Sequence, residues 1–181
     1  MKTLAFLALA FAAVGRAGDW TQPVEVRSQE TLCISYQARL DGPFLVIRAK
    51  IEPGWHTFAM DNKQRAEEKL AGKRALSVDR ATEIDVGGSL QSETPWYQTP
   101  PKDFSRPQLR WFSWGFDHEA TFVTKIRQFA TGPAQIAIRG QACTETVCKN
   151  IDATISLVVT KAESEHSEVD LKSLIPVAPP R

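Results

Sequence analysis

The sequence predicts an all-β protein, an antiparallel β-sandwich with one short inserted helix. The main observation is that apolar side chains recur at every second position in several stretches of about ten residues. Glycine and proline separate these stretches, as expected for strands that are joined by turns. One stretch, residues 61–73, lacks the alternation and carries good helix formers instead. Several short strands with this punctuation are typical of a two-sheet sandwich.

The predicted strands can be taken in chain order. Every second residue from Leu32 to Leu40 is apolar, which indicates a half-buried strand. The same alternation continues from Leu45 to Ile51, and Pro53 and Gly54 end that second strand. Further strands are predicted at residues 120–129, 134–143 and 150–159.

Three segments do not fit the strand pattern. Residues 61–73 predict a short helix that begins at Asp61 or Asn62 and stops at Gly72. Residues 91–107 contain four prolines and predict an ordered irregular loop. After Thr160 the chain becomes polar and then proline-rich, so residues 161–181 predict a mobile tail.

The first 17 residues have the pattern of a secretory signal peptide. Lys2 is followed by an unbroken apolar run from Leu4 to Val14, and small residues then precede a cleavage site after Ala17. The alternative is an uncleaved anchor, but the run is well short of the ~20 residues that span a bilayer. The sequence therefore predicts a periplasmic or secreted protein with one domain at residues 18–160.

The charge of the chain argues against two classes of partner. The formal net charge is +1, and no dense run of lysine and arginine stands out. Binding to nucleic acid or to an anionic membrane surface is therefore not expected. No second apolar segment is long enough to span a membrane, so no membrane insertion of the mature chain is expected.

Two of the three cysteines lie at facing ends of a predicted β-hairpin. Cys143 ends one strand, Cys148 begins the next, and four residues separate them. Opposed residues of an antiparallel pair have Cα atoms ~4.5–5.5 Å apart, within the ~4.4–6.8 Å that disulfides prefer. The hairpin suits an inert staple and a reversible disulfide equally well. However, so small a loop yields little stabilisation from loop closure, which favours a functional pair.

Three motifs, in order, resemble a known family. PGWHTF follows a strand, LRWFSWGF is rich in aromatic residues, and GQACTETVC leads into the last strand. Together, behind a signal peptide, they resemble the N-terminal periplasmic domain of the DsbD family of thiol:disulfide interchange proteins, over about residues 20–160. The resemblance implies an immunoglobulin-like sandwich. It also implies a cysteine pair that takes electrons from a thioredoxin-like domain and passes them to other periplasmic thiol proteins.

The resemblance also assigns roles to individual residues. Cys148 matches the cysteine that forms the mixed disulfide with partners, and Cys143 matches the one that resolves it. An aromatic cap loop would lie within Arg110–Phe116, drawing on Trp111, Phe112, Trp114 and Phe116, with Phe112 or Trp114 preferred. Packing of this aromatic cluster in the core is an alternative of about equal weight, since edge strands are also rich in aromatic residues. No organic cofactor and no metal are implied. The partners would be thioredoxin-fold or other thiol proteins, with a membrane electron donor acting in trans.

Other interpretations remain open at this stage. The domain is alternatively a binding module with an inert disulfide, because the fold supports many functions. A copper site made by Cys143, Cys148 and His118 is a weaker alternative, because it has few ligands. Cys33 is expected to be a buried free thiol rather than a third redox cysteine. His56 is interpreted as a structural histidine, because nothing near it in sequence completes a site.

Overall fold

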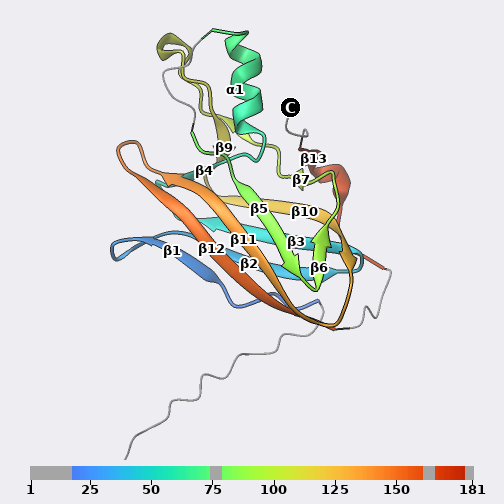
Figure 1. The fold of residues 1–181 in the computed structure, drawn as a ribbon. Coiled ribbons are helices and arrows are strands. Elements are labelled where there is room, and N and C mark those ends of the chain that lie inside the picture. Colours follow the sequence, from blue (N-terminus) through green and yellow to red (C-terminus); the bar gives the residue numbers. More distant parts are fainter. Residues whose placement is uncertain (1–17, 74–78, 161–165, 178–181) are drawn as a thin grey trace, which may run out of the picture.

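Two antiparallel sheets pack face to face in the computed structural model, which describes residues 18–73, 79–160 and 166–177 (Figure 1). The predicted fold class, an immunoglobulin-like antiparallel sandwich with a short inserted helix, is confirmed. The predicted signal peptide, residues 1–17, lies outside the described residues.

In the described part of the chain the first sheet has seven strands and the second has six. The first sheet runs in the order β1 (Val24–Ser28), β2 (Thr31–Asp41), β3 (Phe44–Ile51), β10 (Glu119–Gln128), β7 (Tyr97–Gln98) and β13 (Ile175–Pro176), and β6 (Leu90–Ser92) also pairs with β10. The second sheet runs in the order β12 (Cys148–Val159), β11 (Gly132–Cys143), β4 (His56–Phe58), β9 (Trp114–Phe116) and β8 (Lys102–Asp103), and β5 (Glu83–Gly88) also pairs with β11.

The core lies between the sheets and follows the predicted alternation. On β12 the alternate residues from Ile151 to Val159 are buried and those between them are exposed. The ring of Phe116 on β9 meets the ring of Phe122 on β10 edge to face, with 5.7 Å between the ring centres. The five long strands predicted from the sequence correspond to β2, β3, β10, β11 and β12.

The inserted helix α1 spans Asn62–Leu70 and projects from one end of the sandwich (Figure 1). Asp61 occupies the N-cap position, although its side chain does not bond the free amides of the first turn. The helix ends at Ala71, whose backbone is left-handed, and Gly72 follows in the same region of φ. Within the described residues, no helix has the length and hydrophobicity that crossing a membrane requires.

The C-terminal segment is ordered where the structure describes it. Residues 166–177 contain a one-turn 3₁₀ helix (Leu171–Ser173) and strand β13, which extends the first sheet beside β7. The amide of Val177 donates to the carbonyl of Trp96 at 2.8 Å, and the amide of Glu168 donates to Asp41 at 3.0 Å. Strand pairing and these two hydrogen bonds hold residues 166–177 against the first sheet, while the mobility of residues 161–181 stays a prediction. The remainder of the predicted tail, residues 161–165 and 178–181, lies outside the described residues.

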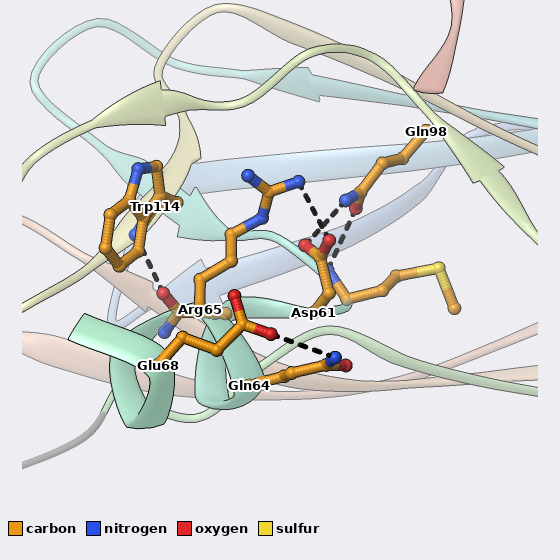
Figure 2. Close-up of polar contacts among 8 residues, drawn as sticks. Asp61, Gln64, Arg65, Glu68, Gln98 and Trp114 are labelled. Carbon is orange, nitrogen blue, oxygen red and sulfur yellow. Dashed lines mark hydrogen bonds and ion pairs between the residues drawn. The ribbon is translucent and has the colours of Figure 1, made fainter. Parts of the chain in front are cut away.

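Buried polar side chains at the start of α1 connect the helix to both sheets (Figure 2). The amide of Gln98, on β7, donates to Asp61 at 2.8 Å, and Arg65 forms an ion pair with the same carboxylate at 2.9 Å. The side-chain oxygen of Asn62 accepts from the backbone amide of Trp114, on β9, at 2.7 Å. The amide nitrogen of Asn62 donates to the carbonyl of Asp79 at 3.1 Å. Asn62 and Gln98 have no exposed surface, so these bonds have no competition from water.

The first prediction concerns Asn62. In Asn62→Ala the amide of Trp114 loses its partner, and so does the carbonyl of Asp79. An unsatisfied buried group costs about 1–3 kcal/mol, so we expect the free energy of unfolding to fall by about 2–4 kcal/mol in urea denaturation.

Gln64→Ala is the matched control, since Gln64 lies on the same helix and bonds only across the helix surface to Glu68. It is expected to change stability by less than about 0.5 kcal/mol. Equal stabilities of the two variants would show that Asn62 is not a structural link.

Candidate active site

Cys143 and Cys148 are joined by a disulfide at the tip of the β11–β12 hairpin. The two residues occupy opposed positions in the register, and their Cα atoms are 4.0 Å apart. The connecting turn is closed by the amide of Thr144, which donates to the carbonyl of Val147 at 2.7 Å. The Thr144 hydroxyl accepts from the amides of Thr146 and Val147 at 3.2 and 3.1 Å. The turn thus keeps the two cysteines opposed.

The two cysteines differ in exposure. Cys143 is only 2% exposed, whereas Cys148 is an exposed residue. An incoming thiolate therefore has access from the Cys148 side of the disulfide. The sequence-based assignment of Cys148 as the partner-linked cysteine and Cys143 as the resolving cysteine stays a prediction, and this asymmetry agrees with it.

The disulfide lies on the outer face of the second sheet, away from the core. On β11 the core-facing residues are alternate ones that include Ile136, Ile138 and Ala142, so Cys143 points outward. An outward residue at a hairpin tip is usually exposed. Its burial therefore requires that other parts of the chain cover this face.

His56 is the neighbour of Cys143 on the other side of β11. The register pairs Cys143 with His56 on β4 and with Cys148 on β12. The three residues therefore lie in a row on the outer face of the second sheet. The imidazole ring of His56 packs against Phe58 with 5.3 Å between ring centres, and against Phe104 with 5.2 Å. From the sequence alone His56 is interpreted as structural, because no partner lies near it in the chain. Its neighbour Cys143 is 87 positions away and comes beside it only through strand pairing.

A hairpin formed by residues 104–113 stands beside this row, and we call it the cover hairpin. Its strands are joined by the amide of Phe104, which donates to Ser113 at 2.9 Å, and by the amide of Arg106, which donates to Trp111 at 2.7 Å. A one-turn 3₁₀ helix (Pro107–Leu109) forms its tip. Figure 1 shows this segment, in olive, rising from the same end of the sandwich as α1.

The cover hairpin is anchored to the segment that follows α1. The indole nitrogen of Trp111 donates to the carboxylate of Asp79 at 2.8 Å, and the guanidinium of Arg106 lies over the Trp111 ring at 5.1 Å. Asp79 is the residue whose carbonyl accepts from Asn62. The position of the hairpin therefore depends on the polar cluster at the start of α1.

The four aromatic residues predicted to form the cap do not form one group. Trp114 and Phe116 lie on β9 and belong to the hydrophobic core, with 8% and 3% exposure, and Phe112 packs against that core. Trp111 is half-buried in the cover hairpin and bonds to Asp79. Trp114 and Phe116 are thus placed as core residues, and the assignment of the four residues to a cap over the disulfide stays a prediction. Phe104, which the sequence analysis did not single out, is the residue of the cover hairpin whose ring packs against His56.

Electrostatics distinguish His56 from the third cysteine. Burial lowers the pKa of His56, the carboxylates of Asp79 and Asp117 partly offset that effect, and Arg106 adds to it. Cys33 is a free, fully buried thiol, as expected, and burial raises its pKa, so it remains protonated at neutral pH.

Within the described residues, no group of three or more histidine, cysteine or acidic side chains is placed to hold a metal ion.

No family model and no curated protein matches this sequence. Among solved structures, the chain is similar to the reduced N-terminal domain of DsbD from Neisseria meningitidis, with 14% identity over 76% of this chain and 83% of that one, and a TM-score of 0.41. It is also similar to a chain in the complex between the DsbD N-terminal and PilB N-terminal domains from the same organism. That match has 11% identity over 80% of this chain and 94% of that one, and a TM-score of 0.47.

Proposed function

We propose that this protein is an exported thiol:disulfide exchange module that passes reducing equivalents between protein partners through Cys143 and Cys148. The observation that carries the proposal is the disulfide itself, with one exposed and one buried cysteine on the outer face of a sheet. Exchange begins with attack of a partner thiolate on an accessible sulfur and ends with displacement by a second thiol. The β11–β12 hairpin places the sulfur of Cys148 where a partner can reach it and the sulfur of Cys143 where it can displace that partner.

A purely structural role is disfavoured by what the disulfide connects. β11 and β12 already pair along their whole length, from Gly132 opposite Val159 to Cys143 opposite Cys148. A covalent bond between strands so fully paired adds little to the sandwich, and it does not join the two sheets. The small enclosed loop also limits stabilisation by loop closure.

In the proposed cycle, a partner thiolate attacks the sulfur of Cys148 and a mixed disulfide forms there. Cys143 leaves as a thiolate, and the second thiol of the donor resolves this mixed disulfide, so that both cysteines are left reduced. The thiolate of Cys148 then attacks the disulfide of an acceptor partner, and Cys143 attacks the sulfur of Cys148 to release that acceptor in reduced form. Lys149 is exposed beside Cys148, and its positive charge favours the Cys148 thiolate. The partners are thioredoxin-fold or other thiol proteins. The protein acts in the periplasm or outside the cell after cleavage at Ala17, and it receives electrons in trans from a membrane donor.

The reduction potential of the pair separates this proposal from an inert staple. Structural disulfides lie below about −300 mV, while exchange-active ones lie above it. We expect the pair to equilibrate in a glutathione or dithiothreitol titration of the native protein, followed by mass spectrometry of alkylated thiols. A native protein that resists reduction at that potential would favour the binding-module alternative.

Mixed-disulfide trapping tests the division of labour between the sulfurs. Cys143→Ser leaves the exposed Cys148 without a resolving thiol, so a single-cysteine thioredoxin presented as its thionitrobenzoate mixed disulfide should remain bound to it. Cys148→Ser leaves only the buried thiol and should trap at least tenfold less on non-reducing gels. Equal trapping by the two variants would contradict the assignment.

Alkylation of the reduced protein tests the cover over Cys143. Phe104→Ala and Trp111→Ala remove rings from the cover hairpin and should speed the reaction of Cys143 with iodoacetamide several-fold without loss of folding. Leu109→Ala is the control, because Leu109 is 48% exposed at the hairpin tip. Trp114→Ala should instead destabilise the fold by about 3–5 kcal/mol, as truncation of a buried aromatic residue does. Unchanged alkylation rates in the Phe104 and Trp111 variants would show that the cover lies elsewhere.

A further inference from the structure

His56 is placed where it can exchange a proton with Cys143. Opposed residues of an antiparallel pair have Cβ atoms about 4.5–5.5 Å apart, and their side chains share a face. Cys143 therefore has the sulfur of Cys148 on one side and the imidazole of His56 on the other. His56 does not belong to the pair that breaks and forms the disulfide, so it is free to act as a proton carrier.

The surroundings keep the imidazole neutral and available. The rings of Phe58 and Phe104 cover it, and its nitrogens form no hydrogen bond with another described side chain or backbone group. The charged groups that face it are Asp79 beyond α1, Asp117 after β9 and Arg106 in the cover hairpin. The two carboxylates stabilise an imidazolium ion when it forms, and burial ensures that the neutral form prevails at neutral pH.

A buried thiol needs such a partner. Cys143 is 2% exposed, and the thiolate is the nucleophile in exchange. Burial disfavours the charged thiolate and raises the pKa of a thiol. Water reaches this sulfur poorly, so a neighbouring base is the direct route for its proton.

We propose that His56 is the proton acceptor for the resolving step, an inference that rests on the proposed exchange function. The thiol of Cys143 gives its proton to the neutral imidazole as its sulfur attacks the sulfur of Cys148 in the mixed disulfide. The Cys143–Cys148 bond forms, the bond from Cys148 to the partner breaks, and the partner leaves as a thiolate. Over attack by Cys148 and resolution by Cys143 together, the partner disulfide is reduced by two electrons and the cysteine pair is oxidised by two, so the exchange needs no other oxidant. In the reverse direction, the imidazolium ion protonates Cys143 as it leaves.

The two sulfurs can be followed separately with 4,4′-dithiodipyridine. Reduced protein should release one equivalent of thiopyridone when the exposed Cys148 attacks the reagent, and a second when Cys143 closes the disulfide. Cys33 is fully buried and should stay silent in the folded protein. Because thiopyridone leaves readily, the second phase reports the deprotonation and attack of Cys143.

In His56→Gln the first phase should be unchanged, and the second should be at least about a hundredfold slower at pH 7, the low end of what general bases contribute. The slow phase should then accelerate about tenfold per pH unit, since only hydroxide-dependent ionisation of Cys143 remains. In the wild type the second phase should stay fast as the pH is lowered to the pKa of His56, which lies below the ordinary ~6.5.

His56→Phe separates proton transfer from packing, because it keeps a ring against Phe58 and Phe104. It should be as slow as His56→Gln if the imidazole accepts the proton, and fast if only the ring matters. His118→Gln, at an exposed histidine, should match the wild type. A fast, unaltered second phase in His56→Gln would overturn this inference while leaving the exchange function standing. Wild-type protein that never releases the second equivalent would overturn the exchange function itself.

Discussion

The pairing of β11 on both of its edges is the constraint on which the candidate site depends. Along one edge β11 pairs with β12 over its whole length, and along the other it pairs first with β5 and then, at its last two residues, with β4. A shift of one position on either edge would turn Cys148 or His56 to the core face. The alternating core residues of β12 oppose such a shift, because it would expose five apolar side chains, Ile151, Ala153, Ile155, Leu157 and Val159. The hydrophobic core therefore fixes the geometry of a site that lies on the opposite face of the sheet.

The cover over that site depends on a second, polar constraint. Asn62 bonds the backbone of β9 and the carbonyl of Asp79, and the carboxylate of Asp79 accepts from Trp111. The buried side-chain amide of Asn62 thus links β9, which follows the cover hairpin, to Asp79, which holds Trp111 in that hairpin. Buried hydrogen bonds of this kind add little net stability, but they are costly to leave unmade. The hydrogen bonds of Asn62 and Asp79 therefore tie the position of the cover hairpin to the start of α1.

The sequence was sufficient for the long strands and for the cysteine pair, because both are local patterns. It failed for the short strands β4, β8 and β9, since two or three residues carry too little periodicity. The sequence WFSWGF nevertheless held a usable signal. Phe112, Trp114 and Phe116 alternate with Trp111, Ser113 and Gly115, which indicates that the three aromatic residues share one face. The burial of Trp114 and Phe116 in the core, with Phe112 packed against it, agrees with that alternation. Phe104 and His56, in contrast, become neighbours through pairings distant in the sequence.

The three cysteines show how burial assigns different chemistry to the same residue. Cys33 has no exposed surface and a raised pKa, and its thiol donates to the nearby carbonyl of Thr31, so it is protonated at neutral pH. Cys143 is almost as buried, yet it lies within bonding distance of a second sulfur and beside an imidazole. Cys148 is exposed and has a lysine next to it. In the proposed exchange, exposure decides which sulfur a partner reaches first. Cys143 differs from Cys33 in that proposal because the strand register gives Cys143 a sulfur on one side and an imidazole on the other.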